Sequence, residues 1–317
     1  MHIAVYLPLL LPLLAARGAV PLARRLPPRL ATWLLTGAAV ALAACSTVAL
    51  ALLAATAAVR IPVLATIERY SLAVVARDDP ASVWVALAAA LLLAAGGLAL
   101  ARVAIRRAQA LLATHRHTRL LPGEEQLVVL PDPSPEAYAA PGRPGRIVVS
   151  TAMLDALSPA EQDALIAHEI SHLTHGHHLF LATAHLAAAL NPLLRPVSRA
   201  VGYTIERWAD EDAAQDAGDR PVVARAVGHA ALASAPAPRA PRPALGLGIA
   251  PALPRDAGDV PRRVAALLIA PARAQRVLLV AAIALVLVAA LATLEAQQDF
   301  EALLELARRA VPGSPVA

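Results

Sequence analysis

Four stretches of this chain are almost wholly apolar, and they decide its fold class. They cover residues 3–16, 30–59, 83–101 and 276–294, and Arg276 is the only charged residue within them. A helix rises 1.5 Å per residue, so about 20 apolar residues cross the roughly 30 Å of hydrocarbon in a bilayer. The pattern predicts a mainly α-helical membrane protein with about four transmembrane helices. A signal peptide is an alternative interpretation of the first stretch, but no basic segment precedes it.

The composition agrees with a location in the membrane. Hydrophobic residues make up 58% of the 317 residues and the mean hydropathy is +0.59, although only 3% of the residues are aromatic. Soluble domains contain roughly 45–50% apolar residues. An ordinary soluble protein is therefore excluded.

Residues 106–275 have a different pattern, which predicts a separate α+β domain between the third and fourth spans. The Val- and Ile-rich segments 126–130 and 146–150 are bounded by Pro and Gly, as strands of a small β-sheet would be. Residues 179–194 are apolar but too few to cross the bilayer twice, so we expect a helix that lies at the membrane interface or packs on the spans. A buried core helix is the alternative. Residues 234–261 are rich in Pro, Ala and Gly and predict a linker.

Basic residues predict the orientation of the spans. All 28 are arginine, and they crowd residues 17–29, 102–119 and 262–276, whereas acidic side chains dominate the tail at 295–317. Because arginine-rich loops stay on the cytoplasmic side, the 106–275 domain should be cytoplasmic and the tail extracytoplasmic in a multi-pass protein of the cell membrane. The sequence pI of about 10.3 then reflects arginines that face anionic lipid headgroups, and no direct contact with nucleic acid is expected.

The segment from His168 to His172 reads His-Glu-Ile-Ser-His and carries the clearest chemistry of the chain. On a helix, His168 and His172 lie one turn apart on one face and can bind one Zn²⁺, while Glu169 can act as general base toward an attacking water. The preceding residues form a helix-start pattern with an N-cap, a proline at the first position and a capping-box glutamate, namely Ser158, Pro159 and Glu161. Two surface histidines that match this spacing by chance are the alternative, which we disfavour.

A zinc hydrolase needs a third protein ligand, and the chain offers two candidates. Glu206 shares a helix face with Asp210, so Glu206 can bind the metal while Asp210 holds the outer N–H of a ligand histidine. His178 stands where a metzincin has its third histidine, but the helix-breaking glycine is displaced by one residue and no methionine lies downstream. We therefore favour Glu206, which predicts a gluzincin-like zincin domain with one Zn²⁺ per chain.

The cytoplasmic part resembles membrane metallopeptidases of the BlaR/MecR type and, more distantly, those of the HtpX and CAAX prenyl protease type. The residues that carry the resemblance are Ala137-Tyr138-Ala139, Ile147-Val148-Val149-Ser150, Leu157-Ser158, Ala167-His168-Glu169-Ile170-Ser171-His172, Asn191-Pro192, Glu206 and Ala209-Asp210. Three spans before the zinc domain and one after it are similar to the BlaR/MecR layout. Ala209, however, stands where the BlaR type usually has Cys, as in HtpX-like proteins. The absence of lysine excludes the Ser-x-x-Lys chemistry of a penicillin-binding sensor.

These observations predict a membrane zinc endopeptidase that cleaves proteins at the cytoplasmic face. The resemblance implies regulatory cleavage of a transcriptional repressor or of the protease itself, with HtpX-like quality control as the alternative. A non-catalytic zinc-containing signalling protein and a zinc-dependent transporter are weaker hypotheses. Expected partners are a protein or peptide substrate, the lipid bilayer and a second copy of the chain in a homodimer. The oxyanion donor is not evident, and Tyr203 and His229 are the candidates.

Overall fold

A computed structural model describes most of the chain. The described residues are 4–59, 71, 74, 82–121, 125–142, 144–234, 259–270 and 275–310.

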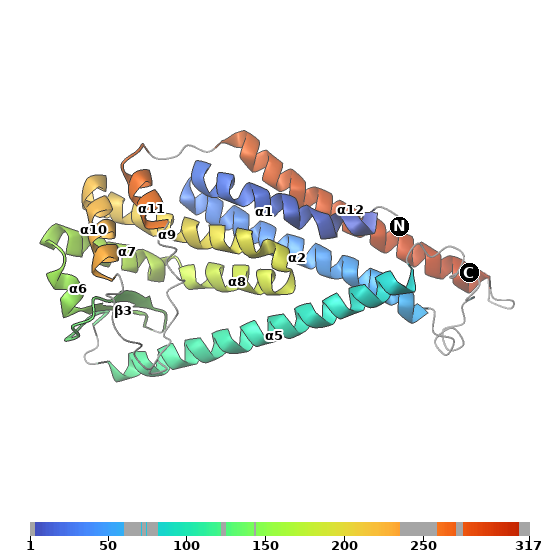
Figure 1. The fold of residues 1–317 in the computed structure, drawn as a ribbon, viewed down its shortest axis with the longest axis horizontal. Helices are drawn as coiled ribbons and strands as arrows, with labels where there is room; N and C mark the ends of the chain where they lie inside the picture. Colours follow the sequence, from blue (N-terminus) through green and yellow to red (C-terminus); the bar gives the residue numbers. More distant parts are fainter. Residues whose placement is uncertain are drawn as a thin grey trace.

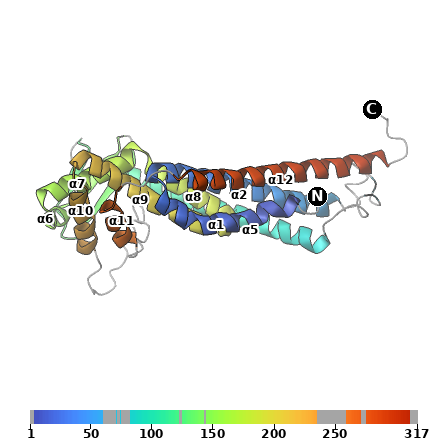
Figure 2. The same ribbon diagram turned by 90° about the horizontal axis from the view of Figure 1, so that it is seen from above.

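Among the described residues, four helices are long and apolar enough to cross a membrane. They are α1 (Leu7–Arg25, preceded by the 3-10 turn η1, Ala4–Tyr6), α2 (Pro28–Val59), α5 (Val83–Leu120) and α12 (Arg276–Arg309). Successive members run in opposite directions, so that α1 ends, α2 begins, α5 ends and α12 begins at the end of the bundle that carries the remaining elements (Figures 1 and 2). The prediction of four membrane helices agrees with this architecture.

The helices are longer than the apolar stretches that predict them. α5 has 38 residues and α12 has 34, which correspond to roughly 57 Å and 51 Å of helix at 1.5 Å per residue. Because the apolar pattern marks only the part that can lie in hydrocarbon, it missed the polar turns that continue each helix. The predicted tail from residue 295 is accordingly helical as far as Arg309.

Alanines make up much of the buried contact within the bundle, beside a few leucines, and many large apolar side chains point outward. The main cluster combines alanines of α1 and α2, such as Ala19 and Ala39, with Ala289 of α12. Trp84 and Val277 are each 80% exposed. Helices that associate in lipid pack through small residues, and lipid itself covers the large apolar ones.

A helical hairpin packs into the bundle and joins the two halves of the candidate site. It consists of α8 (His177–Leu190), the 3-10 turn η2 (Pro192–Leu194) and α9 (Arg195–Ala217). At its tip, the Asn191 side-chain amide donates to Ser46 Oγ of α2 at 3.0 Å. A Cβ at Gly96 of α5 would lie 3.0 Å from the Leu190 carbonyl oxygen, so glycine permits this close approach. Helix α8 packs against α2 and α5, one of the two arrangements predicted for residues 179–194, and the association of this segment with the membrane stays a prediction (Figure 1).

The small sheet has three strands in the order β1-β3-β2. They are β1 (Leu127–Leu130), β2 (Ala137–Ala140) and β3 (Arg146–Ser150), with β1 parallel and β2 antiparallel to β3. β1 and β3 confirm the two predicted strands, whereas β2 was not predicted, because alanine has a low preference for strands. Edge strand β2 and central strand β3 both contact α7 (Pro159–Thr174).

Three shorter helices complete the end of the molecule that holds the sheet. They are α6 (Thr151–Asp155), α10 (Arg220–Ala233) and α11 (Asp259–Leu267). Most of the predicted linker at 234–261 falls outside the described residues, but its last three residues already belong to α11. α11 packs on α10 and α9 and precedes α12 in the chain.

Candidate metal centre

Helix α7 begins where the sequence predicts and brings both histidines to one face. The Glu161 carboxylate accepts the Ser158 backbone N–H at 3.0 Å, which completes the capping box. His168 and His172 follow on the next turns, with 3.1 Å between their Nε2 atoms. Gly176 then adopts a left-handed conformation, with φ of 61°, and separates α7 from α8.

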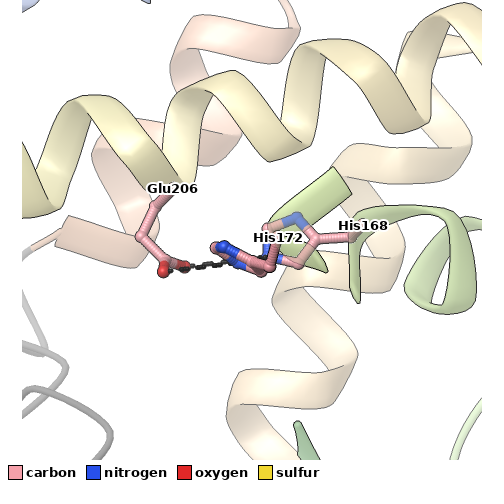
Figure 3. Close-up of side chains that lie close together, drawn as sticks. All are labelled: His168, His172 and Glu206. Atoms are coloured by element: carbon pink, nitrogen blue, oxygen red, sulfur yellow. Dashed lines mark hydrogen bonds and ion pairs between the residues drawn. The ribbon is translucent and has the colours of Figure 1, made fainter. Parts of the chain in front are cut away.

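Helix α9 supplies the third group of the centre. Glu206 Oε2 lies 3.8 Å from His168 Nε2, and Glu206 Oε1 lies 3.7 Å from His172 Nε2. Figure 3 shows the three side chains converging. Among the described residues, this is the only group of three such side chains whose candidate ligand atoms all lie within 4.8 Å of one another, and His178 is not part of it.

The donor set fits a zinc ion. Zinc binds imidazole nitrogen and carboxylate oxygen at about 2.0–2.2 Å in tetrahedral geometry, which places two ligand atoms roughly 3.3 Å apart. The two imidazole Nε2 atoms are 3.1 Å apart, close to that value, and one ligand atom from each of the three residues lies within 4.8 Å of the others. His168, His172 and Glu206 would therefore hold Zn²⁺ and leave a fourth position for substrate chemistry.

The outer nitrogen of each histidine faces a buried side chain. Asp210 Oδ1 lies 3.0 Å from His168 Nδ1. The sequence predicts this contact, because Asp210 lies one helical turn after Glu206 on the same face of the helix. Burial lowers the pKa of His168, but Asp210 more than offsets this and the pKa is raised overall. Asp210 thus holds the ring of His168 with Nε2 directed at Glu206.

His177 plays the corresponding role for His172. Its Nδ1 lies 2.9 Å from His172 Nδ1. Burial lowers the pKa of His177 to about 3, with a further contribution from the neighbouring His172. His177 is therefore neutral near pH 7 and can accept the Nδ1–H of His172 when His172 Nε2 binds a metal.

Arg263 of α11 is part of the centre and was not identified from the sequence. Its guanidinium donates to Asp210 through Nε at 2.8 Å and through Nη2 at 2.6 Å, and Nη1 lies 2.8 Å from Glu206 Oε2. Although burial raises the pKa of Asp210, Arg263 holds this pKa well below its usual range. One buried cation therefore fixes both a candidate ligand and the carboxylate that orients another.

His175 and the two oxyanion candidates lie in other environments. His175 Nε2 lies 3.0 Å from Asp212 Oδ2, and its ring packs on Trp208 with 4.7 Å between centroids. His229 Nδ1 lies 3.1 Å from Glu161 Oε1, at the start of α7, so the structure does not support it as an oxyanion donor. Tyr203 packs against the bundle core, with the Arg207 guanidinium 5.9 Å from its ring centroid.

A cleft opens beside the centre, between α7, α10 and α11. His168, Glu169 and Arg263 form its polar wall, and Glu169 is only 4% exposed. The rest of the lining is aliphatic. Three potential ligands, a carboxylate that can act as a base and an adjoining cleft are the elements of a hydrolase site.

Residues 106–190 match the model of peptidase family M48. The match covers under a third of the chain and includes the His-Glu-x-x-His segment, but it stops before Glu206 and Asp210. It supports a metallopeptidase, a class that is generally zinc-dependent. No curated protein and no solved structure matched the chain. The finer resemblances to the BlaR/MecR and HtpX types therefore stay predictions.

Proposed function

We propose that this protein is a membrane-embedded zinc endopeptidase whose active centre is formed by His168, His172, Glu206 and Glu169. The observation that carries the proposal is the convergence of the first three side chains next to the cleft that Glu169 lines. The match to a metallopeptidase family over the segment that holds both histidines supports it independently.

The side chains divide the chemistry between them. When bound, Zn²⁺ would polarise the scissile carbonyl and stabilise the negative charge that develops on its oxygen. Glu169 would take the proton from the attacking water and deliver it to the leaving nitrogen. Asp210 and His177 keep the rings of His168 and His172 directed at one point, so little reorientation is needed on binding. A non-catalytic zinc centre would have no use for Glu169 in a cleft.

The substrate would bind as an extended peptide. β2 is an edge strand of the sheet and contacts α7, so a peptide added to its free edge would run close to the centre. Strand addition uses backbone hydrogen bonds and leaves side chains to determine specificity. A protein segment in an extended or locally unfolded conformation is the substrate class that this arrangement favours.

The orientation and the role belong to the same proposal. The arginine distribution favours a cytoplasmic centre close to the bilayer. The layout of three spans before the centre and one after it favours regulatory cleavage, of a repressor or of the protease itself, over general quality control.

Replacement of the general base tests the proposal. The zinc-loaded Glu169→Gln variant, purified in detergent, should keep about one zinc per chain and lose peptide cleavage by at least a hundredfold, because only proton transfer is removed. Zinc is measured by metal analysis after dialysis, and cleavage by mass spectrometry of a casein digest.

Two further variants test the ligand set. Glu206→Ala should lose most of its zinc on dialysis, while the matched control His178→Ala should keep it. Cleavage by Glu169→Gln at the rate of the parent protein would refute the proposed mechanism. Zinc loss in His178→Ala but not in Glu206→Ala would refute the ligand assignment.

A further inference from the structure

Beside the candidate ligands, α7 and α9 share a second row of polar contacts. Ser171 and its neighbour one turn later, the C-cap residue His175, lie next to the face of α7 that holds His168 and His172. Ser171 Oγ donates to Asp212 Oδ2 at 2.6 Å, and His175 Nε2 lies 3.0 Å from the same oxygen. One carboxylate oxygen of α9 thus holds both ends of the last turn of α7, which includes His172.

The ring of His175 packs on α9 as well. It lies against Trp208, one turn before Asp212, with 4.7 Å between the ring centroids and an angle of 30° between the planes. The Trp208 ring also lies 4.7 Å from the ring of His177, the first residue of α8. Trp208 and Asp212 therefore fix the turn between α7 and α8 on the helix that carries Glu206.

This second row restrains a ligand that the first row leaves less constrained. Asp210 holds the ring of His168 from α9 itself, whereas the outer nitrogen of His172 faces His177, which follows the turn. The position of His172 relative to α9 therefore depends on how that turn is held. Ligand positions need to be fixed to within about 0.5 Å for a preorganised site. Ser171 is buried, so solvent does not readily replace the carboxylate that its hydroxyl contacts.

We propose that Asp212 is a positioning residue of the metal centre, which holds the last turn of α7 so that Nε2 of His172 is directed at the same point as His168 and Glu206. The inference rests on the zinc centre of the proposed function and adds a residue that is not a ligand. Asp212 acts through Ser171 and His175, so its removal should weaken zinc binding while all three ligands stay in the chain.

The zinc affinity of the full-length protein in detergent, measured by competition with a chelator, tests the assignment. Asp212→Ala should weaken zinc binding about tenfold, because both contacts to the turn are lost. Asp212→Asn keeps a carbonyl oxygen that can accept from both donors, and it should bind zinc within about threefold of the parent. Asp216→Ala is the matched control, because Asp216 is exposed and lies one turn further along α9.

Two measurements separate positioning from a general structural role. The visible absorption spectrum of the Co²⁺-loaded protein reports the coordination geometry, so it should change in Asp212→Ala and stay as in the parent in Asp212→Asn. Ser171→Ala should weaken zinc binding less than Asp212→Ala, and it should add no further loss in the Asp212→Ala background, because the two residues form one contact. A purely structural role would instead lower the thermal midpoint of the zinc-free protein and leave the Co²⁺ spectrum unchanged.

The outcomes distinguish this inference from the proposed function. Unchanged zinc affinity in Asp212→Ala, or equal losses in Asp212→Ala and Asp216→Ala, would overturn the assignment and leave the endopeptidase function intact. An Asp212→Asn variant as weak as Asp212→Ala would also overturn it. If zinc binding depends on Asp212 as stated but the parent cleaves no peptide, the assignment is supported and the endopeptidase function is wrong.

Discussion

Arg263→Met is the substitution that tests most directly how the centre is held together. The change removes the guanidinium that contacts Asp210 and Glu206 but keeps a side chain of similar length. Asp210 is 1% exposed, so among the described residues its carboxylate would be left buried with His168 as its only charged or hydrogen-bonding side-chain neighbour. The loss of one partner from a buried ion pair costs about 3–5 kcal/mol, because the remaining charge stays uncompensated.

The expected result has two parts. The free energy of unfolding should fall by about 3 kcal/mol, measured by thermal denaturation of the zinc-free protein in detergent. Zinc affinity should fall by roughly 10–100-fold in a chelator competition, because Asp210 and Glu206 lose the group that fixes them. Arg263→Lys should recover part of both losses, since an ammonium keeps the charge but cannot replace the fork of three nitrogens.

The neighbouring residue provides the control for this experiment. Arg262 is exposed and contacts only Asp259 in the described part of the chain, at 3.3 Å and three residues away. An exposed pair of this kind contributes about 0–1 kcal/mol, so Arg262→Met should change stability little and leave zinc affinity unchanged.

A second charge removal, Asp210→Asn in the Arg263→Met background, should recover part of the lost stability. If Arg263→Met behaves like Arg262→Met in both assays, the assigned role of Arg263 is wrong.

The remaining predictions concern orientation and pH. In a Cys45→Ala background, single cysteines at the exposed positions Arg24 and Asp163 should be protected from an impermeant thiol reagent added outside cells, whereas one at Glu301 should react. The opposite labelling pattern would show that the predicted orientation is wrong. His177 has a folded-state pKa of about 3, below the unfolded value of 6.5, so its contribution to stability is full above pH 6.5 and is lost as the pH falls toward 3. At pH 5 the lost contribution is about 2 kcal/mol. The difference in free energy of unfolding between the zinc-free parent and zinc-free His177→Gln should therefore be smaller at pH 5 than at pH 8 by roughly this amount. A difference that does not change with pH would contradict the prediction.

Local spacing explains what could be predicted of the candidate site. The pairs His168 with His172 and Glu206 with Asp210 are each four residues apart, and helix geometry alone places each pair on one face. The helix start at Ser158 is similarly local. Spacing alone cannot show that the face of α7 with the two histidines lies against the face of α9 with Glu206 and Asp210, and the structure shows that it does.

Arg263 could not have been found in this way. It lies 53 residues beyond Asp210, after the Pro- and Ala-rich segment, and it is one of 28 arginines in the chain. Helical spacing places Arg263 on the same face of α11 as Val260, Val264 and Leu267, whereas its neighbour Arg262 is exposed. Only the packing of α11 on α9 and α10 brings that face to Asp210, and the local spacing does not show this packing.

The dependence of the centre on the membrane helices is the other feature that required the structure. Glu206 lies on α9, and the residues around it bind the spans: Arg207 donates to the Ala23 carbonyl at 2.7 Å, and the hydroxyl of Thr32 donates to that of Thr204 at 2.9 Å. The tip of the hairpin is tied to α2 through Asn191. Because α9 is one arm of this hairpin and α7 leads directly into the other, contacts inside the bundle help to position Glu206 relative to His172. The candidate span helices α1 and α2 therefore form part of the scaffold of the candidate metal centre, because α9, which carries Glu206, packs directly on both.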